Sequence, residues 1–526
     1  MPPIDPNALP KDVSILQKII VDLCAQLQQE STEKDKYRSL LRELLDAERG
    51  RKSEQLSKEQ LALFEELWKA SETDQDEEES EADTGPEQDK TQEAQTKKRS
   101  GRQPLAKDVI RERIVHDLSE AEKHCDGCGK DLRLIAEETS ERYEYIPASI
   151  KVIEDVRRKY ACDCTVKAAE KPAQPIEKST AGASMLAQVI VSKYADHQPL
   201  HRQERIFERQ GVWISRKTMG GWLPTVAELV HPLYEAAKKV LFDSKVIGTD
   251  DTGVKVLDRK LPFARTGRIW PYVGDAHHPV VLYDYTPTRG RDGPARFLEG
   301  YQGYLQADAY VVYDAFFKSA RGLTEVGCMM HARRYFYKAL EWDQQRMGKA
   351  LHLIARLYGI EDRAKGLTGE ERFKLRQRLT SPVVAQLHQY LLRIREEVLP
   401  KSAAAKAVRY ALNQWNALSR FLEDGDLEID NGATERANRD VAIGRGNWTF
   451  FGSDNGGKTA AVLMSFIAMC RRNAVEPFAW FRDVLSRIAQ HPVHRLAELL
   501  PHNWKPIDTA APVSYTHLTL PTNREV

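Results

Sequence analysis

Hydrophobic and polar positions follow a helical period at the start of the 526-residue chain, and the pattern then breaks off. The apolar residues recur at spacings of three and four, which places them on one stripe of a helix. They are Val13, Leu16, Ile20, Leu23 and Leu27, followed after a gap by Tyr37, Leu41 and Leu44. Residues 1–70 are therefore predicted to form an N-terminal helical or coiled-coil region, either a dimerising hairpin or an ordinary amphipathic helix. In residues 71–102 apolar positions nearly vanish, which predicts an acidic, disordered linker.

Strand and helix patterns alternate in the second half of the chain. Residues 176–243 read as helices, whereas "SKVIGTDDTGVKVL", which begins at Ser244, reads as a strand. Two more strands surround an Asp-Ala-His-His turn, and a short helix then leads into the strand-like "GYLQADAYVVY". This alternation indicates an α/β sheet. Residues 341–424 are almost entirely helical in pattern, and residues 425–506 bring further helices.

Composition and charge narrow the class of protein. No apolar run reaches membrane-spanning length and the N-terminus lacks the apolar core of a signal peptide, so we expect a cytoplasmic, nucleoid-associated protein with no membrane partner. The stretch from Glu72 to Asp89 carries ten acidic and no basic residues, and without it the net charge rises from +1 to +11. A basic body indicates a polyanionic partner such as nucleic acid.

Four cysteines form two close pairs. Cys125 and Cys128 have the C-x-x-C spacing, and Cys162 and Cys164 the tighter C-x-C spacing. Two such pairs supply the four thiolates that a structural zinc ion prefers, so residues 103–175 are predicted to form a zinc-binding domain. The alternative is a set of unliganded buried thiols.

A helix-turn-helix pattern lies in the predicted helical, DNA-binding region 176–243. One helix is expected to end at Arg209, a turn follows at Gly211, and a second helix begins at Ser215. Arg216 and Lys217 would start that second helix, where recognition helices meet DNA. A plain helical hairpin fits the same pattern.

Three acidic residues are candidates for metal-dependent chemistry. Asp250 and Asp308 end predicted strands, and Glu435 lies on a predicted helix that Asp430 or Asn431 can cap. If they converge, their oxygens can hold magnesium or manganese ions for phosphodiester cleavage. The simpler interpretation of Glu435 is an ion pair with Arg439, one turn further along the helix.

A phosphate-loop pattern, G-x-x-x-x-G-K-[ST], occurs at Gly452, Gly457, Lys458 and Thr459. It raises the alternative of an ATPase that acts on nucleic acid. About seventy residues follow Lys458, and they read as helices with no hydrophobic strand ending in Asp. The sheet that such a nucleotide site requires is therefore not expected, and contact with DNA phosphates is the preferred role of this turn.

Several longer motifs carry a family resemblance. "KYADHQPLHRQERI", "LQADAY", "CMMHARRYF" and "IDNGATERANRDVAIGRGNWTFFGSDNGG" occur in this order. Together they resemble the insertion sequence 66 family of transposases, from about Asp12 to Lys505. The resemblance implies a multidomain α/β plus α protein with a ribonuclease-H-like core, split into residues 244–340 and 425–506 by the helical insertion. It also implies that Asp250, Asp308 and Glu435 are catalytic and bind the divalent metal.

The resemblance further implies a DNA transposase. It would bind the terminal inverted repeats of its element, cut a strand and join the 3′-hydroxyl to target DNA, as a homo-oligomer that could need accessory proteins of the same element. The predicted DNA contacts are Arg216, Lys217, Arg333, Arg334, Arg436, Arg439, Arg445 and Lys458. A non-enzyme alternative is a zinc-finger DNA-binding protein with an inactive core.

Departures from the family pattern leave some positions open. The first motif reads Asp-Asp-Thr-Gly where Asp-Glu-Thr-Pro is expected, which leaves Asp251 as an alternative to Asp250. Glycines stand at 432 and 446 where the family usually has asparagine and lysine. Cys328 and His331 resemble the family's C-x-x-H and are interpreted as a buried cysteine and a histidine near the acidic residues or the DNA. Residues 507–526 match nothing in the family and are excluded as a non-native tail.

Overall fold

The computed structural model describes residues 149–156, 159–162, 165–168, 174–258, 260–308, 312–313, 317 and 322–506. The predicted N-terminal helices, the acidic linker, the C-terminal tail and three of the four candidate zinc ligands lie outside these residues. Within them, no helix is long and apolar enough to cross a membrane.

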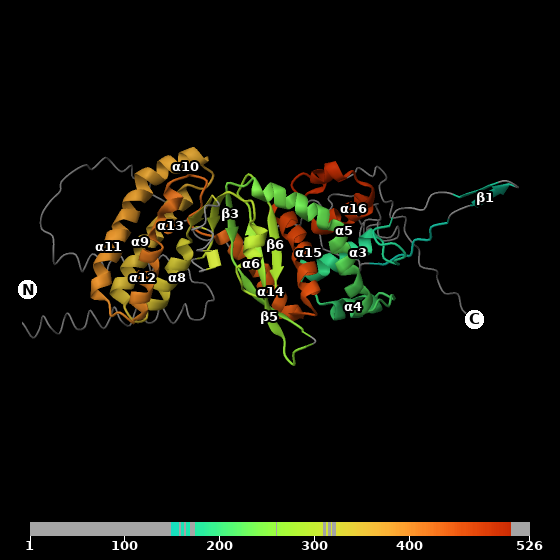
Figure 1. Ribbon diagram of the computed structural model, residues 1–526, viewed down its shortest axis with the longest axis horizontal. Helices are drawn as coiled ribbons and strands as arrows, with labels where there is room; N and C mark the ends of the chain where they lie inside the picture. Colours follow the sequence, from blue (N-terminus) through green and yellow to red (C-terminus); the bar gives the residue numbers. More distant parts are fainter. Residues whose placement is uncertain are drawn as a thin grey trace, which may run out of the picture. The chain divides into compact units, whose positions relative to one another are not determined.

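The described residues form a mixed seven-stranded sheet and a separate two-stranded one (Figure 1). The large sheet consists of β3 (Val246–Thr249), β4 (Thr252–Val256), β5 (Arg265–Val273), β6 (Val281–Thr286), β7 (Gly303–Gln306), β8 (Leu323–Val326) and β9 (Phe450–Phe451). The small sheet pairs β1 (Lys159–Cys162) with β2 (Thr165–Ala168). The strands predicted after Ser244 are confirmed, whereas β8 and the two-residue β9 were not predicted.

Strand pairing gives the large sheet its topology. β3, β7 and β8 run parallel, and β5 is antiparallel to β3, β4 and β6. Thr249 pairs with Tyr272 and Thr252 with Ile269, so β3 and β4 continue one register along the same edge of β5. They are one strand interrupted at two residues, Asp250 and Asp251.

Aromatic side chains on the two faces of the sheet bind different helices. Tyr272 on β5 stacks on Phe297 of α6 (Asp292–Phe297), with ring centroids 3.7 Å apart. On the opposite face, Tyr283 donates a 2.9 Å hydrogen bond from its hydroxyl to the Ala437 carbonyl of α14 (Gly432–Trp448). The backbone amide of Tyr283 also donates to Ser465 of α15 (Asp454–Arg472). The β-strands are therefore buried between helical layers, which explains their nearly continuous hydrophobic sequence.

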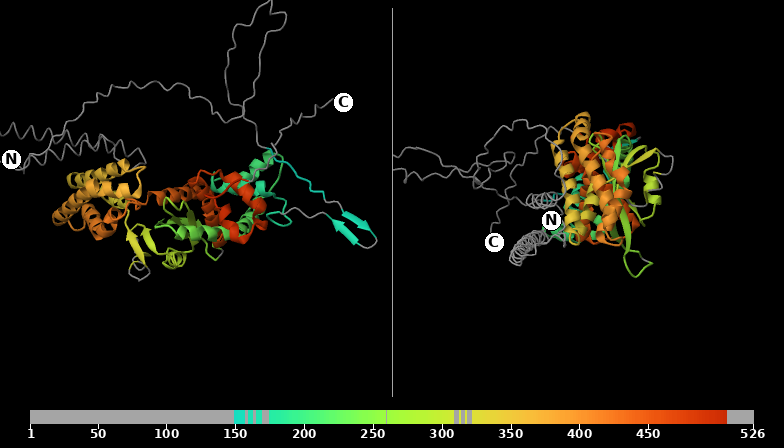
Figure 2. Two further views of the ribbon diagram at one scale, coloured as in Figure 1. Left: turned by 90° about the horizontal axis from the view of Figure 1, so that it is seen from above. Right: turned by 90° about the vertical axis from the view of Figure 1, so that its left-hand side faces the viewer.

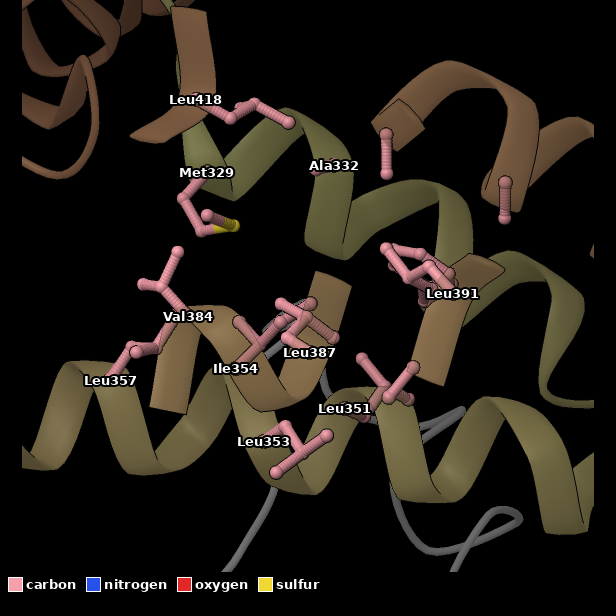
Figure 3. Close-up of a cluster of buried hydrophobic side chains, with 14 of the residues drawn as sticks. Met329, Ala332, Leu351, Leu353, Ile354, Leu357, Val384, Leu387, Leu391 and Leu418 are labelled. Atoms are coloured by element: carbon pink, nitrogen blue, oxygen red, sulfur yellow. The ribbon is translucent and has the colours of Figure 1, made fainter. Parts of the chain in front are cut away.

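Most of the helices between β8 and α14 share one hydrophobic core (yellow to orange in Figure 1). They are α8 (Met329–Ala339), α9 (Gln344–Arg363), α11 (Ser381–Glu397), α12 (Ala403–Asn413), α13 (Trp415–Ser419) and η4 (Arg420–Leu422). Between α9 and α11 lie α10 (Gly369–Leu375) and the π-helix η3 (Arg376–Thr380), which contribute no residue to this core. Figure 3 shows Met329 and Ala332 of α8 in contact with the same cluster as Leu351 and Leu387. The helical pattern predicted from residue 341 is confirmed, and α8, which precedes it, belongs to the same core.

A buried arginine joins this helical group to the segment that leads into α14. Arg376 is fully buried, and its guanidinium pairs with both carboxylate oxygens of Glu361 at 2.9 and 2.7 Å. Its Nη1 donates to the carbonyls of Phe421, Asp424 and Leu427. Each of the three guanidinium nitrogens therefore has a hydrogen-bond partner, which offsets the cost of burying the cation.

Three further helices precede the sheet, and the predicted helix-turn-helix backbone is present among them. They are α3 (Ala183–Tyr194), α4 (Leu200–Arg209) and α5 (Arg216–Phe242). Gly211 turns the chain with a φ of +82°, a value that favours glycine. Ser215 caps α5 by accepting from the Thr218 amide. At the C-terminal side, α16 (Pro477–Arg487), η5 (Ile488–Gln490) and η6 (Val493–Leu499) follow α15, and α16 packs on α3 (Figure 2).

Candidate active site

Asp250 occupies the interruption between β3 and β4. Its Oδ1 accepts a 2.7 Å hydrogen bond from the Asp251 amide, and its Oδ2 accepts a 2.8 Å bond from Nδ2 of Asn438 on α14. Burial raises the pKa of Asp250 from 3.8 to about 6, and the negative charge of Asp308 adds to this effect. The carboxyl is thus held in an environment that disfavours its charged form.

The start of α14 lies directly against β3, beside Asp250. Asn431, the N-cap residue, donates from Nδ2 to the Thr249 carbonyl at 2.8 Å, and its amide donates to the Cys328 thiol at 3.3 Å. Gly248 allows this approach, because a Cβ at that position would lie 2.5 Å from Thr434 Oγ1. These contacts therefore hold the first turn of α14 next to the interruption between β3 and β4.

Glu435, in that first turn, lies near two basic side chains of α8. Its Oε1 lies 3.8 Å from Nε2 of His331 and 3.8 Å from a terminal nitrogen of Arg334. Burial raises the pKa of Glu435, and these two side chains oppose that shift. No ion pair joins Glu435 to Arg439, although both residues are described, so the simpler interpretation of Glu435 was wrong.

The two alternative carboxylates bind arginines instead. The Asp251 side chain is 2% exposed and pairs with Arg268 at 2.8 Å and with Arg289 at 2.7 Å. Glu428, the nearest glutamate before Glu435, is exposed and pairs with Arg372 at 2.9 Å. The ion pairs of the Asp251 carboxylate therefore stabilise the start of the β4–β5 hairpin.

Asp308 lies two residues after the end of β7 and is partly buried. The Gln306 side chain fixes the end of this strand by donating to the Glu428 carbonyl at 2.8 Å. The charges of Asp308 and Asp250 influence each other, which brings the second predicted aspartate to the same region. Among the residues that the structure describes, no three His, Cys, Asp or Glu side chains converge closely enough to form a ready-made metal site.

Two further side chains belong to this site. Asn438 lies one turn after Glu435 on α14, and its Oδ1 is buried without a hydrogen-bond partner, as is Nδ1 of His331. The sequence already placed His331 near the acidic residues or the DNA. Asn438 was missed, and the only available signal was its spacing of three from Glu435.

The predicted DNA contacts lie on four helices. Arg216 and Lys217 are exposed at the start of α5, Arg436 and Arg439 are exposed on α14, and Lys458 is exposed on α15. On α8, Arg334 faces Glu435, and the Arg333 guanidinium lies 5.9 Å from the centre of the Tyr337 ring. Arg445 on α14 donates to the Thr252 hydroxyl at 2.9 Å and to the Gly253 carbonyl at 2.7 Å, so it also holds β4 in place.

Only one of the candidate zinc ligands lies in the described residues. Cys162 is the last residue of β1, paired in register with Thr165 at the start of β2. Cys162 therefore lies at the end of the small hairpin where β1 and β2 are joined. Cys125, Cys128 and Cys164 lie outside the described residues. Cys328 is buried, and burial raises the pKa of its thiol to about 12, as expected for an unliganded cysteine.

The phosphate-loop pattern does not fold as a phosphate loop. α15 begins at Asp454, so the residues between Gly452 and Lys458 are mostly helical, and neither Gly452 nor Gly457 has a positive φ. Gly457 is required for packing, because a Cβ there would lie 2.5 Å from the ring of Tyr285. The Tyr285 hydroxyl and Arg265 both bind the Asp454 carboxylate. The backbone of this segment therefore does not form the loop that binds phosphates in such ATPases, which argues against the ATPase alternative.

The fold and the site define a multidomain α/β protein with an acidic centre bordered by basic helices. Residues 178–459 match the family described as "Transposase IS66 family", and residues 122–165 match "zinc-finger binding domain of transposase IS66". Residues 465–502 match "IS66 C-terminal element", and residues 36–114 match "Transposase C of IS166 homeodomain". The chain belongs to the IS66 transposase family, which confirms the resemblance seen in the sequence.

Related chains occur in Sinorhizobium fredii (strain NBRC 101917 / NGR234). "Uncharacterized protein y4hP" is 34% identical over 435 residues, which cover 78% of each chain. "Uncharacterized protein y4qI" is 34% identical over 409 residues, 74% of this chain and 76% of the relative. Family membership implies a transposase-type enzyme that binds DNA, uses a divalent metal and carries a zinc-binding domain.

Proposed function

We propose that the protein binds the terminal inverted repeats of an insertion sequence and catalyses strand cleavage and strand transfer, with Asp250, Asp308 and Glu435 as the catalytic carboxylates. The observation that carries the proposal is the meeting of the β3–β4 interruption with the first turn of α14. This contact brings Asp250 and Glu435 together from positions 185 residues apart in the sequence.

The strand order supports a ribonuclease-H-like core. A central strand, β3, has two parallel neighbours on one side, β7 and β8, and an antiparallel β5 followed by β6 on the other. Asp250 ends the central strand and Asp308 follows its parallel neighbour. In open sheets with parallel strands, sites form at these carboxyl ends.

The acidic side chains fit a hard divalent cation such as Mg²⁺ or Mn²⁺. Their donors are oxygens, which these ions prefer, and the raised pKa values of Asp250 and Glu435 reflect burial and mutual repulsion that a cation would relieve. When bound, such an ion would polarise the phosphodiester and activate the attacking water or 3′-hydroxyl. Cys125, Cys128, Cys162 and Cys164 are the thiolates that we assign to a separate structural Zn²⁺.

Other residues of the site would orient these carboxylates. Asn438 holds one oxygen of Asp250, and His331 and Arg334 face Glu435, so each carboxylate has a defined direction before substrate binds. Arg334 is also placed to meet a phosphate, because a guanidinium pairs well with phosphate oxygens. The exposed cations of α5, α14 and α15 would hold the DNA backbone.

The test is an isosteric replacement of each carboxylate. Asp250→Asn, Asp308→Asn and Glu435→Gln should each abolish cleavage and joining of labelled transposon ends with Mg²⁺ or Mn²⁺, and leave binding of those ends largely intact. Glu428→Gln is the matched control, because Glu428 is exposed and pairs with Arg372, and it should keep parental activity. If Glu435→Gln joins ends at the parental rate, the third carboxylate is misassigned. If the parental protein binds ends and never cuts them, the non-enzyme alternative is favoured.

A further inference from the structure

The helical group between β8 and α14 carries a face without acidic residues. α8 reads MMHARRYFYKA and α12 reads AAAKAVRYALN, so neither helix contains Asp or Glu. Along α8, the residues His331, Arg334, Tyr335 and Lys338 follow spacings of three and four, which places them on one stripe. A helical stripe of this composition is cationic and aromatic.

A second stripe on α12 joins the first. Lys406, Arg409 and Tyr410 lie one turn apart, and Tyr410 stacks on Tyr335 with ring centroids 4.4 Å apart. α8 and α12 lie side by side in Figure 1, so the two stripes form one continuous surface. Tyr335 is 43% exposed despite this stacking.

Three cations of this surface have no ion-pair partner among the residues that the structure describes. Lys338, Lys406 and Arg409 are exposed, and none makes an ion pair or a side-chain hydrogen bond with the residues that the structure describes. Some exposed cations elsewhere in the helical group are paired, for example Lys374 with Glu370 at 2.6 Å and Lys365 with Asp362 at 2.7 Å, whereas others, such as Arg363 and Arg378, have no ion pair among the described residues. The α8–α12 surface differs from these single positions because two adjoining helices without carboxylates form it, and it is complementary to a polyanion.

The surface begins at the candidate active site. His331 and Arg334, near the start of α8, lie 3.8 Å from Glu435, and the stripe runs from there to Lys338. The stripe spans roughly 12 Å, which corresponds to about three base pairs of duplex. A DNA strand at the carboxylates can therefore continue over this surface.

We propose that the α8–α12 surface binds the phosphate backbone of duplex DNA and holds the end whose strand is cut at Glu435. This inference rests on the proposed function. The contacts are ammonium and guanidinium groups that pair with phosphate oxygens, and phosphate contacts carry no sequence information, so we expect the surface to hold DNA of any sequence. The helical insertion is thus part of the substrate site as well as a support for α14.

The test measures DNA binding by a double variant that carries Lys338→Ala and Arg409→Ala. Both substitutions are introduced into Glu435→Gln protein, so that no strand is cut during the measurement. Lys365→Ala with Lys374→Ala in the same background is the matched control, because it removes the same charge from exposed positions outside α8 and α12. Dissociation constants are measured for a transposon-end duplex and for a scrambled duplex of equal length, across roughly 50 to 300 mM salt.

We expect the Lys338 and Arg409 double variant to bind both duplexes roughly tenfold more weakly at low salt, with a salt slope reduced by about two. The control should keep the parental slope. An unchanged slope and affinity in the double variant would overturn the inference, while loss of cleavage in the carboxylate variants would still uphold the proposed function. Conversely, a reduced slope in a protein that never cuts DNA would uphold the surface and refute the proposed function.

Two other outcomes would assign the surface to a different role. A loss confined to the transposon-end duplex would indicate base recognition rather than a backbone contact. Binding of a synthetic peptide of residues 72–89 that depends on Lys338 and Arg409, with duplex affinity unchanged, would assign the surface to the chain's own acidic segment. Alanine is a strong helix former, so unchanged thermal melting should accompany each variant.

Discussion

Gly248→Ala should separate the two elements that form the site. An added Cβ would lie 2.5 Å from Thr434 Oγ1 and 2.6 Å from Asn431 Oδ1, well inside ordinary contact distance. Both side chains are almost fully buried, so they can move only if the first turn of α14 moves. Overpacking of this kind costs about 1–3 kcal/mol, and loss of the Asn431 bond to the Thr249 carbonyl adds about 1 kcal/mol. The expected loss of stability is about 2–4 kcal/mol.

The assay is urea unfolding of metal-free protein, together with cleavage of transposon ends under conditions where the variant is folded. Cleavage should fall more than the folded fraction does, because Glu435 lies in the turn that is displaced. Gly446→Ala is the matched control: it lies on the same helix, its Cβ would meet nothing within 4 Å, and it should gain about 0.5–1 kcal/mol. If Gly248→Ala unfolds within about 0.5 kcal/mol of the parent and cuts normally, the close packing of β3 and α14 does not position the site.

Three further predictions address charge, metal and nucleotide. The pKa of Asp250 is raised to about 6, so ionisation of this carboxyl lowers the stability of the folded protein as the pH rises from 4 to 7. In thermal melts, Asp250→Asn should therefore stabilise the metal-free protein by about 2–3 kcal/mol at pH 8 and by little at pH 4. Equal gains at both pH values would contradict this prediction. Elemental analysis should find about one zinc per chain, lost when Cys125 and Cys128 are both changed to serine. Lys458→Ala should lower the salt slope of DNA binding by about 0.9, because one phosphate contact is lost. Strand transfer should need no ATP. Saturable ATP binding that Lys458→Ala removes would contradict the prediction that ATP is not used.

Long segments with a strong period were predictable from the sequence. The alternation after Ser244 predicted β3 to β7, and the apolar period from residue 341 predicted the helical group, because each pattern extends over many residues. The helix-turn-helix followed from local signals, the glycine at 211 and the serine cap at 215. The three catalytic candidates came from the family resemblance, since isolated acidic residues carry no signal of their own.

Short elements and contacts between distant segments were not predictable. β9 has two residues and exists only because β4 offers an unpaired edge, to which the Phe450 and Phe451 backbone binds in parallel. One position of the phosphate-loop pattern has a related cause: Gly457 is required by the ring of Tyr285, which is more than 150 residues away in the sequence. The role of Asn438 could not be predicted from the sequence, because it depends on the contact between α14 and the interrupted strand.

The adjacent residues Asp250 and Asp251 have identical side chains but different electrostatic surroundings in the fold. Asp251 is fully compensated by Arg268 and Arg289, so its charge stabilises the hairpin that continues the strand. Asp250 accepts one hydrogen bond from the Asn438 side chain and one from the Asp251 backbone amide, and burial together with the charge of Asp308 raises its pKa to about 6. A carboxylate with few compensating charges has more stabilisation to gain from a cation than one already paired to two arginines. The electrostatics of the interruption therefore favour Asp250 over Asp251 as the aspartate that we propose to bind metal, and exchange of the two roles would require Asp251 to lose both arginines.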